Sequence, residues 1–130
     1  MSGCGGGSSA PTKAQYVSKI NAICVAEKQQ LTQIALAKTK LPVTLERATA
    51  LREQTLGQIE AVKRPSSEPI APEWLALRRK ALSLAKRIGA LGLGARRAQP
   101  LNREYVTVTN TAERIALAYG ITGCRGFSAV

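Results

Sequence analysis

Apolar residues recur at steps of three and four along most of this chain, which is the spacing of one face of an α-helix. The pattern predicts four helices, over residues 12–40, 43–63, 73–95 and 100–119. It is most regular in the third helix, whose apolar seam has the spacing of a coiled-coil heptad. That seam consists of Trp74, Leu77, Ala81, Leu84, Ile88, Leu91 and Ala95.

Residues at the ends of these stretches support the same four helices. Thr12 stands where an N-cap is expected, and Pro42 marks the turn before the second helix, which Pro65 then ends. Gly120 occupies the position of a left-handed C-cap, with Ile121 placed to make the accompanying apolar contact. Glycines at positions 89, 92 and 94 predict fraying or a bend late in the third helix, since each costs about 0.8–1 kcal/mol relative to alanine.

Three prolines within residues 64–72 predict an extended, semi-rigid link between two helical hairpins. The only β-like stretch, residues 106–109, is short. The predicted fold is therefore all-α, an antiparallel four-helix bundle with up-down-up-down topology. We assign residues 12–124 to this single domain, residues 1–11 to a flexible lipoprotein tether or an expression remnant, and residues 125–130 to a C-terminal tail.

The residues around Cys4 indicate a lipid attachment site. Ser2-Gly3-Cys4 resembles the end of a bacterial lipobox, in which a leader is cleaved before a cysteine that then carries lipid. Met1 stands where a lipobox has Leu or a similar residue, and the charged and apolar parts of a leader do not precede it. The alternative is an expression tag with an unrelated cysteine.

Two further cysteines remain if Cys4 is lipidated. Cys24 lies in the first predicted helix and Cys124 just after the last, and these positions are neighbours in an up-down-up-down bundle. A disulfide between them fits an oxidising, extracytoplasmic location and is worth about 4.7 kcal/mol in the chain-entropy treatment. The alternative is a pair of unpaired buried thiols, which pack as small apolar groups.

Several short motifs occur together in a known group of proteins. They are the Gly/Ser-flanked Cys4, Ala22-Ile23-Cys24, Pro72-Glu73-Trp74, and Ala118-Tyr119-Gly120-Ile121 followed by Cys124. On these motifs the chain resembles small actinobacterial secreted proteins and lipoproteins. The resemblance implies a helical fold outside the cytoplasm. Because most such proteins have no assigned biochemical activity, it implies no catalytic residues.

The composition excludes several kinds of active site. The chain has no His and no Asp, which removes His-dependent triads, His-ligated metal sites and Asp-based phosphoryl transfer. Ser83 and Lys86 have the spacing of a Ser–Lys catalytic pair, but this match arises readily by chance in a Lys-rich helix. We therefore predict a protein that is not an enzyme and that uses no cofactor and no metal. No apolar run is long enough to cross a membrane.

Positive charge is concentrated between residues 74 and 103, where eight basic residues occur without an acid in a chain of net charge +11. These residues are Arg78, Arg79, Lys80, Lys86, Arg87, Arg96, Arg97 and Arg103. The heptad seam leaves Arg79, Lys86, Arg87 and Arg97 on the outward side. Such a face would attract an anionic polymer, a lipid headgroup or a protein. The alternative is a solvated face that keeps the protein soluble.

One charged residue interrupts the apolar face of each of the first two helices, Glu27 in the first and Arg52 in the second. An unpaired buried charge is costly, and the turn at Pro42 brings the two residues to similar levels. We therefore predict an internal ion pair between Glu27 and Arg52. The alternatives are a pair at the rim of the helix interface and a binding pocket built on Glu27.

Together these features predict a non-enzymatic domain anchored by lipid at Cys4 to the outer side of a bacterial cell membrane. It would bind or scaffold an anionic partner at the cell envelope through its basic third helix. One alternative is a carrier of a small apolar ligand or lipid in the bundle interior, which an apolar cavity of about 300 Å³ or more would favour. The other is a basic nucleic-acid-binding module, although the sequence lacks the motif spacings expected of such a module.

Overall fold

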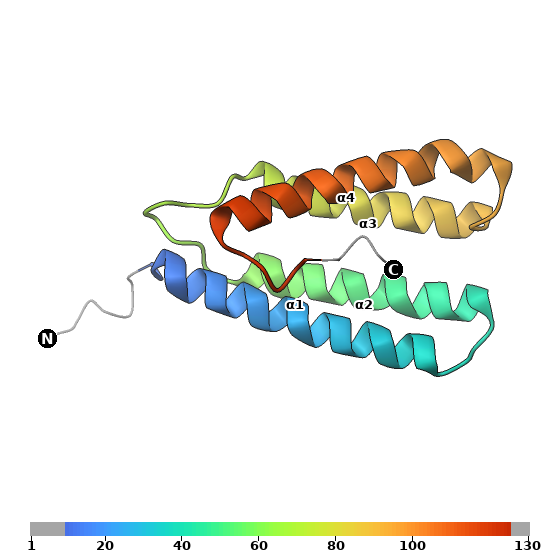
Figure 1. Cartoon of the computed structure of the whole chain (residues 1–130), viewed down its shortest axis with the longest axis horizontal. Helices are drawn as coiled ribbons and strands as arrows, with labels where there is room; N and C mark the ends of the chain where they lie inside the picture. Colours follow the sequence, from blue (N-terminus) through green and yellow to red (C-terminus); the bar gives the residue numbers. More distant parts are fainter. Residues whose placement is uncertain (1–9, 126–130) are drawn as a thin grey trace, which may run out of the picture.

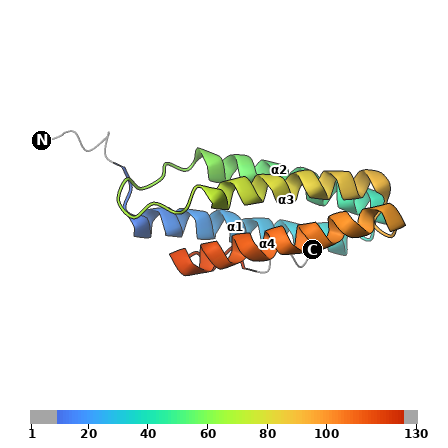
Figure 2. The same cartoon turned by 90° about the horizontal axis from the view of Figure 1, so that it is seen from above.

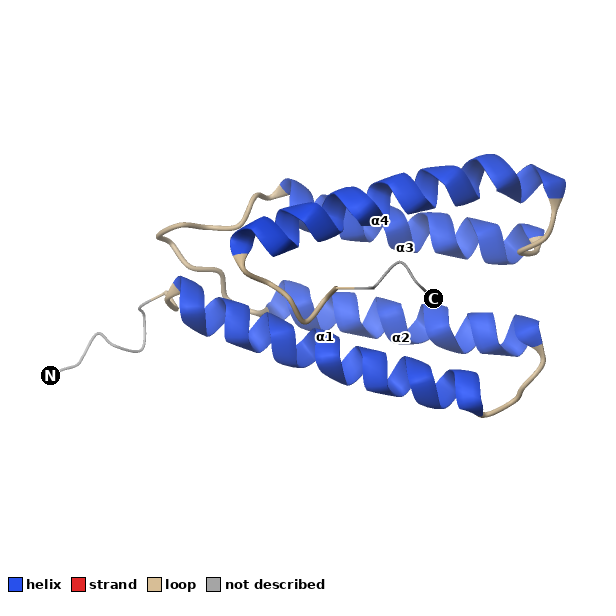
Figure 3. Cartoon of the chain, in the orientation of Figure 1, coloured by secondary structure: helices blue, strands red, loops and turns tan. Residues whose placement is uncertain are grey.

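The computed structural model describes residues 10–125, and within that range it contains helices and no strands. The helices are α1 (Lys13–Leu36), α2 (Leu41–Ala61), α3 (Glu73–Leu91) and α4 (Gln99–Tyr119), with a 3₁₀ turn at Arg96–Ala98. The predicted all-helical bundle is confirmed (Figure 3). Cys4 lies outside the described residues, as do most of the predicted tether and most of the predicted tail.

The four helices lie roughly along one axis. Figure 1 shows α1 and α2 in one layer and α3 and α4 in the other, and Figure 2 places α4 on the side of α1 and α3 on the side of α2. The α1–α2 and α3–α4 connections lie at the same end in both views, which we call the tip. The start of α1 and the α2–α3 connection lie at the opposite end, which we call the base.

Two helix ends follow the predicted caps. The Thr12 hydroxyl accepts a hydrogen bond from the Gln15 backbone N–H at 3.1 Å, and the Gln15 side chain accepts one from the Thr12 N–H at 2.9 Å. After α4, Gly120 adopts the left-handed conformation with φ of 104°, and the Ile121 N–H donates to the Ala116 carbonyl at 2.8 Å. Ile121 is fully buried, which supplies the expected apolar contact.

Other expected boundaries differ from the structure. α1 ends at Leu36 instead of residue 40, and Leu41 begins α2 and is 55% exposed. Pro42 lies inside the first turn of α2 because a first-turn N–H has no intrahelical partner to lose. α3 ends at Leu91, since Gly92 adopts a φ of 93°, so the seam stops short of residue 95.

At the base, side chains from all four helices form one core. Its members include Tyr16 and Ile20 of α1, Ile59 of α2, Trp74 of α3, Ala112 and Ala116 of α4, and Ile121. The largest of these side chains are at most 1% exposed, and burial of a large apolar side chain contributes about 1.5–3 kcal/mol. This shared core holds the two hairpins together.

Toward the tip the buried apolar residues divide into two clusters. One consists of Leu31, Ala48 and Leu51, between α1 and α2, and the other of Ala81, Leu84 and Val108, between α3 and α4. In this half of the bundle each hairpin therefore packs mainly on itself. The region between the hairpins is left to the polar groups and the groove described below.

Candidate functional site

A buried polar layer separates the shared core from the two clusters near the tip. It contains Glu27 of α1, Arg52 and Thr55 of α2, Arg78 of α3 and Thr109 of α4, each at most 8% exposed. Because every helix contributes at least one of these side chains, the layer extends across the whole bundle. It is the only buried level among the described residues that gathers charged groups.

Glu27 is the carboxylate of this layer. Burial raises the pKa of the Glu27 carboxyl, while the Thr55 hydroxyl and the charges of Arg78 and Arg52 oppose that rise. Neither Glu27 carboxylate oxygen makes a hydrogen bond of good geometry within residues 10–125. The structure thus places Glu27 and Arg52 in one buried layer, as the expected ion pair requires, and adds Arg78 as a second cation with the larger influence on the Glu27 pKa.

Arg78, one of the eight residues predicted to bind an anionic partner, is buried. Arg78 is 7% exposed, and its guanidinium lies over the Trp74 ring, 5.6 Å from the ring centroid, which is a cation–π distance. Burial lowers the pKa of Arg78, and the Glu27 carboxylate opposes that effect. The sequence carried a signal for this, because Arg78 lies four residues after Trp74 and three before Ala81, on the face that packs inward.

Three other basic residues of α3 form ion pairs on the surface. The pairs are Arg79 with Glu60 at 2.7 Å, Lys80 with Glu104 at 3.0 Å, and Lys86 with Glu53 at 3.0 Å. They join α3 to α2 and to α4. Exposed pairs of this kind contribute only about 0–1 kcal/mol, but each sets a carboxylate beside the cation and so reduces the local positive potential.

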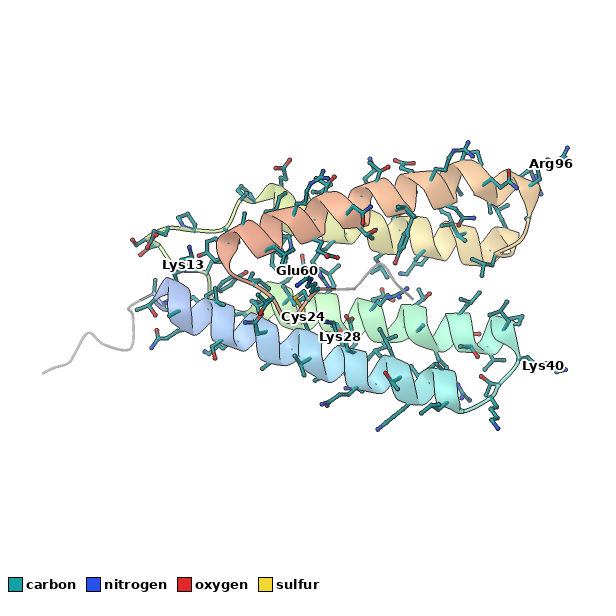
Figure 4. All side chains as sticks on the ribbon, in the orientation of Figure 1. Lys13, Cys24, Lys28, Lys40, Glu60 and Arg96 are labelled. Carbon is teal, nitrogen blue, oxygen red and sulfur yellow. A yellow bond between two sulfur atoms is a disulfide. The ribbon has the colours of Figure 1, made fainter. Side chains whose placement is uncertain are left out.

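The other four predicted anion-binding residues are exposed. They are Arg87, Arg96, Arg97 and Arg103, which form no ion pair within the part of the chain that the structure describes. Arg96 and Arg97 belong to the 3₁₀ turn, and Figure 4 shows Arg96 at the same end of the molecule as Lys40. The basic residues without a carboxylate neighbour therefore lie toward the tip rather than along the middle of α3.

The tip also exposes large apolar side chains. Leu36, Leu41 and Leu93 are 70%, 55% and 46% exposed. We define the tip surface as Leu36, Lys38, Lys40, Leu41, Val43, Leu91, Leu93, Arg96 and Arg97, all of which are exposed. Sequence reasoning missed this surface because it placed the helix ends several residues away and assigned Leu91 to the apolar seam.

A groove of about 270 Å³ opens between α2, α3 and α4, on the tip side of the polar layer. We call it the tip groove. Its apolar walls include Leu45, Ala48, Ile88 and Val106. Among the described residues, Arg52 is the only charged one that lines it. Its volume is slightly below the 300 Å³ expected of a carrier. A second hollow of about 490 Å³ lies beside it between α2 and α3 and is lined in part by Glu46, Glu53 and Lys86, so it is more polar.

The tip groove meets the polar layer at Arg52. Arg52 and Tyr105 line the groove, and together with Arg78 of the layer they also line a small hollow of about 10 Å³. The Tyr105 hydroxyl is buried and has no hydrogen-bond partner within residues 10–125. The inner end of the groove therefore offers hydrogen-bond donors and positive charge, and it suits an anionic or hydrogen-bond-accepting group.

Cys24 and Cys124 lie at disulfide distance, with their Cα atoms 4.9 Å apart. Both are buried, Cys24 at 1% and Cys124 at 4% exposure. The segment that carries Cys124 returns from the end of α4 across the side between α4 and α1, where Figure 4 labels Cys24. The predicted proximity of these two cysteines is confirmed.

None of the helices formed by residues 10–125 is both long and apolar enough to cross a membrane. The family resemblance expected from the sequence stays a prediction. No protein-family model, no curated protein sequence and no solved structure matches this chain.

Proposed function

We propose that this chain is a non-enzymatic, extracytoplasmic helical domain, anchored by lipid at Cys4, whose tip surface binds anionic lipid headgroups at the bacterial cell envelope. The proposal includes membership of the actinobacterial lipoprotein group. It also includes an up-down-up-down bundle with a Pro-rich link, which the alternate ends of the connections in Figure 1 support.

The observation that carries the proposal is the coincidence of exposed apolar and basic side chains on the tip surface. Residues 36–43 and 91–97 together contain four basic residues and no acid, and they include the three most exposed leucines. Anionic headgroups attract nearby Lys and Arg at about 1 kcal/mol per residue, and exposed leucines gain further by entering the interface. A polysaccharide or a nucleic acid would use the charge but not the leucines, so lipid is the favoured partner.

The pairing of Cys24 with Cys124 supports the proposed compartment, because disulfides form and persist in oxidising surroundings outside the cytoplasm. The pairing also leaves Cys4 as the odd cysteine of three, which a lipid would occupy. Lipid on Cys4 would keep the domain at the membrane and raise the effective concentration of headgroups near it. Weak binding of headgroups by the tip surface would then be enough to keep that surface at the membrane.

The experiment that tests the tip surface is co-sedimentation of the unlipidated chain with vesicles made of equal parts phosphatidylglycerol and phosphatidylcholine. The test variant replaces Lys38, Lys40, Arg96 and Arg97 with Gln. If each cation contributes about 1 kcal/mol, this variant binds on the order of a hundredfold or more weakly. A second variant, Leu36→Ser with Leu41→Ser, is expected to weaken the binding that persists at high salt, because salt screens the charges and not apolar insertion.

The matched control removes the same number of positive charges from the middle of α3. It replaces Arg79, Lys80, Lys86 and Arg87 with Gln, and it is expected to retain most of the vesicle binding because three of these residues already face carboxylates. Equal losses in the two charge variants would show that total charge decides the interaction, and would overturn the tip surface as the site. Binding to uncharged vesicles as tight as to anionic ones would do the same.

A further inference from the structure

We infer that the tip groove binds one molecule of a medium-chain fatty acid, with the carboxylate against Arg52 and Tyr105 and the alkyl chain along the apolar walls. The site is distinct from the tip surface, with which it shares Leu93. It does not depend on the proposed function, since a groove that takes a single fatty acid molecule needs neither a lipid anchor nor a membrane.

The apolar half of the site exists because the bundle core divides. Between the two clusters near the tip, the facing positions on α2 and α3 are occupied by small residues, Ala48, Ala85 and Gly89, which line the groove. A Cβ added at Gly89 would meet no atom within 4 Å. The walls above these positions are aliphatic, including Leu45, Ile88 and Val106, so the groove suits an alkyl chain.

The polar half of the site consists of the side chains at the inner end of the groove. Arg52 lines the groove and carries a positive charge, and the Tyr105 hydroxyl is buried without a hydrogen-bond partner within residues 10–125. A ligand carboxylate at this end would accept hydrogen bonds from a guanidinium and from the Tyr105 hydroxyl. No carboxylate of the described residues lines the groove to compete for that position.

The size of the groove selects among amphipathic acids. At about 270 Å³ it lies near the lower limit of small-molecule sites, which span about 300–1,000 Å³. One alkyl chain of medium length fits this space better than the two chains of a phospholipid. The hollow of about 10 Å³ behind it, bounded by Arg52, Arg78 and Tyr105, has room for roughly one water-sized group, such as a carboxylate oxygen.

The test is isothermal titration of the full chain with decanoate, compared with decanol and decyltrimethylammonium at concentrations below their micelle formation. Decanoate is expected to bind with one-to-one stoichiometry. Decanol, which has the same chain without the charge, is expected to bind at least about tenfold more weakly, and the cation is expected not to bind. Decanol binding as tightly as decanoate, or no binding of decanoate, would overturn the inference.

Three variants locate the site without relying on removal of a buried charge. Tyr105→Phe removes only the hydroxyl and is expected to weaken decanoate binding by about tenfold while leaving decanol binding unchanged. Gly89→Leu fills the groove and is expected to abolish binding, whereas Gly57→Leu, at an exposed and open position on the neighbouring helix α2, is expected to leave it intact. Unchanged binding in Gly89→Leu would place the ligand elsewhere.

The same variants separate this inference from the proposed function. Gly89→Leu is expected to bind anionic vesicles as the original chain does, and the variant lacking the four tip charges is expected to bind decanoate normally. Loss of decanoate binding in the tip-charge variant would assign the fatty acid to the tip surface and overturn the groove as its site.

Discussion

The backbone N–H of Gly123 donates a hydrogen bond to the Asn21 side-chain oxygen at 2.8 Å, one helical turn before Cys24 on α1. The next residue after Gly123 is Cys124, whose Cα lies 4.9 Å from that of Cys24. The hydrogen bond between Gly123 and Asn21 therefore helps to hold Cys124 close to Cys24. The chain closes on itself through a polar contact and a covalent one at neighbouring positions.

Gly123 leaves no room for a side chain at this contact. A Cβ added there would lie 2.7 Å from the Asn21 carbonyl oxygen and 2.8 Å from the Asn21 Cα, both backbone atoms that cannot turn aside. We expect Gly123→Ala to lower the free energy of unfolding by about 1–3 kcal/mol, measured by urea denaturation under non-reducing conditions. Gly57→Ala, at an open position in α2, is the control and should raise stability by up to about 1 kcal/mol. A Gly123→Ala variant as stable as the original chain would contradict the tight approach.

Removal of the disulfide should cost more than any of these local changes. The cysteines are 100 residues apart in sequence, and a bond that closes a loop of this length is worth about 4.7 kcal/mol in the chain-entropy treatment. We expect the double variant Cys24→Ser, Cys124→Ser to lose about 2–5 kcal/mol of unfolding free energy. Cys4→Ser is the control, and it should unfold at the same urea midpoint as the original chain. A double variant with an unchanged urea midpoint would show that the bond does not constrain the unfolded chain.

Glu27 should make stability fall as pH rises. Burial raises the pKa of the Glu27 carboxyl in the folded state, so folding favours its protonated form. The stability that this group contributes is present below the unfolded pKa and is lost as pH rises through the folded pKa. Because glutamine resembles the protonated carboxyl and does not titrate, Glu27→Gln should match the original chain near about pH 4 and be more stable near about pH 7.5.

Urea midpoints at the two pH values measure this difference. Glu46→Gln, which changes an exposed carboxyl on α2, is the control and should show a smaller difference between them. A Glu27→Gln variant that is less stable near pH 7.5 would mean that the attraction of Arg78 and Arg52 for the carboxylate outweighs its burial, contrary to the raised pKa.

Arg78 should be the most costly of the basic residues to remove. It is 7% exposed, lies over the Trp74 ring and shares the polar layer with the Glu27 carboxylate, whose charge opposes the lowering of the Arg78 pKa by burial. Removal of one partner from a buried charge pair typically costs about 3–5 kcal/mol. We expect Arg78→Ala to fall in that range by urea denaturation, whereas Arg79→Ala, which breaks an exposed pair with Glu60, should cost about 0–1 kcal/mol.

A double variant shows whether the cost comes from the charge. If Glu27 is the group left uncompensated, Glu27→Gln should raise the stability of the Arg78→Ala variant near about pH 7.5 by more than it raises that of the original chain. An equal gain in the two backgrounds would assign the cost to the missing contact with Trp74 instead.

The repeating apolar pattern predicted the helices well because burial of one face dominates helix formation in a bundle. Thr12 and Gly120 marked helix ends correctly, since a capping side chain and a left-handed glycine act locally. The ends near Pro42 and Gly92 were misplaced, because both residues are compatible with more than one position relative to a helix terminus. The local sequence does not determine which of these positions each residue takes. The packing of the neighbouring helical turns determines it.

The site was less predictable than the helices. Arg78 shares the spacing of inward-facing residues, but its charge grouped it with the predicted anion-binding residues, and its packing against Trp74 is a contact that the sequence does not specify. The tip groove depends on Ala48 facing Ala85 and Gly89 from another helix, which is a relation between helices that no single stretch of sequence encodes. The proximity of Cys24 and Cys124 was predictable because one cysteine lies in the first helix and the other just after the last, and the bundle brings those two ends together.

The location at the cell envelope is the claim on which the proposed function depends. The most direct test expresses the gene with the sequence that precedes Met1 in its genome in an actinobacterial host fed an alkyne fatty acid. We predict a labelled protein in the membrane fraction, no label on Cys4→Ser, and retained label on the Cys24→Ser, Cys124→Ser variant. An unlabelled original chain recovered from the cytosol would contradict the account.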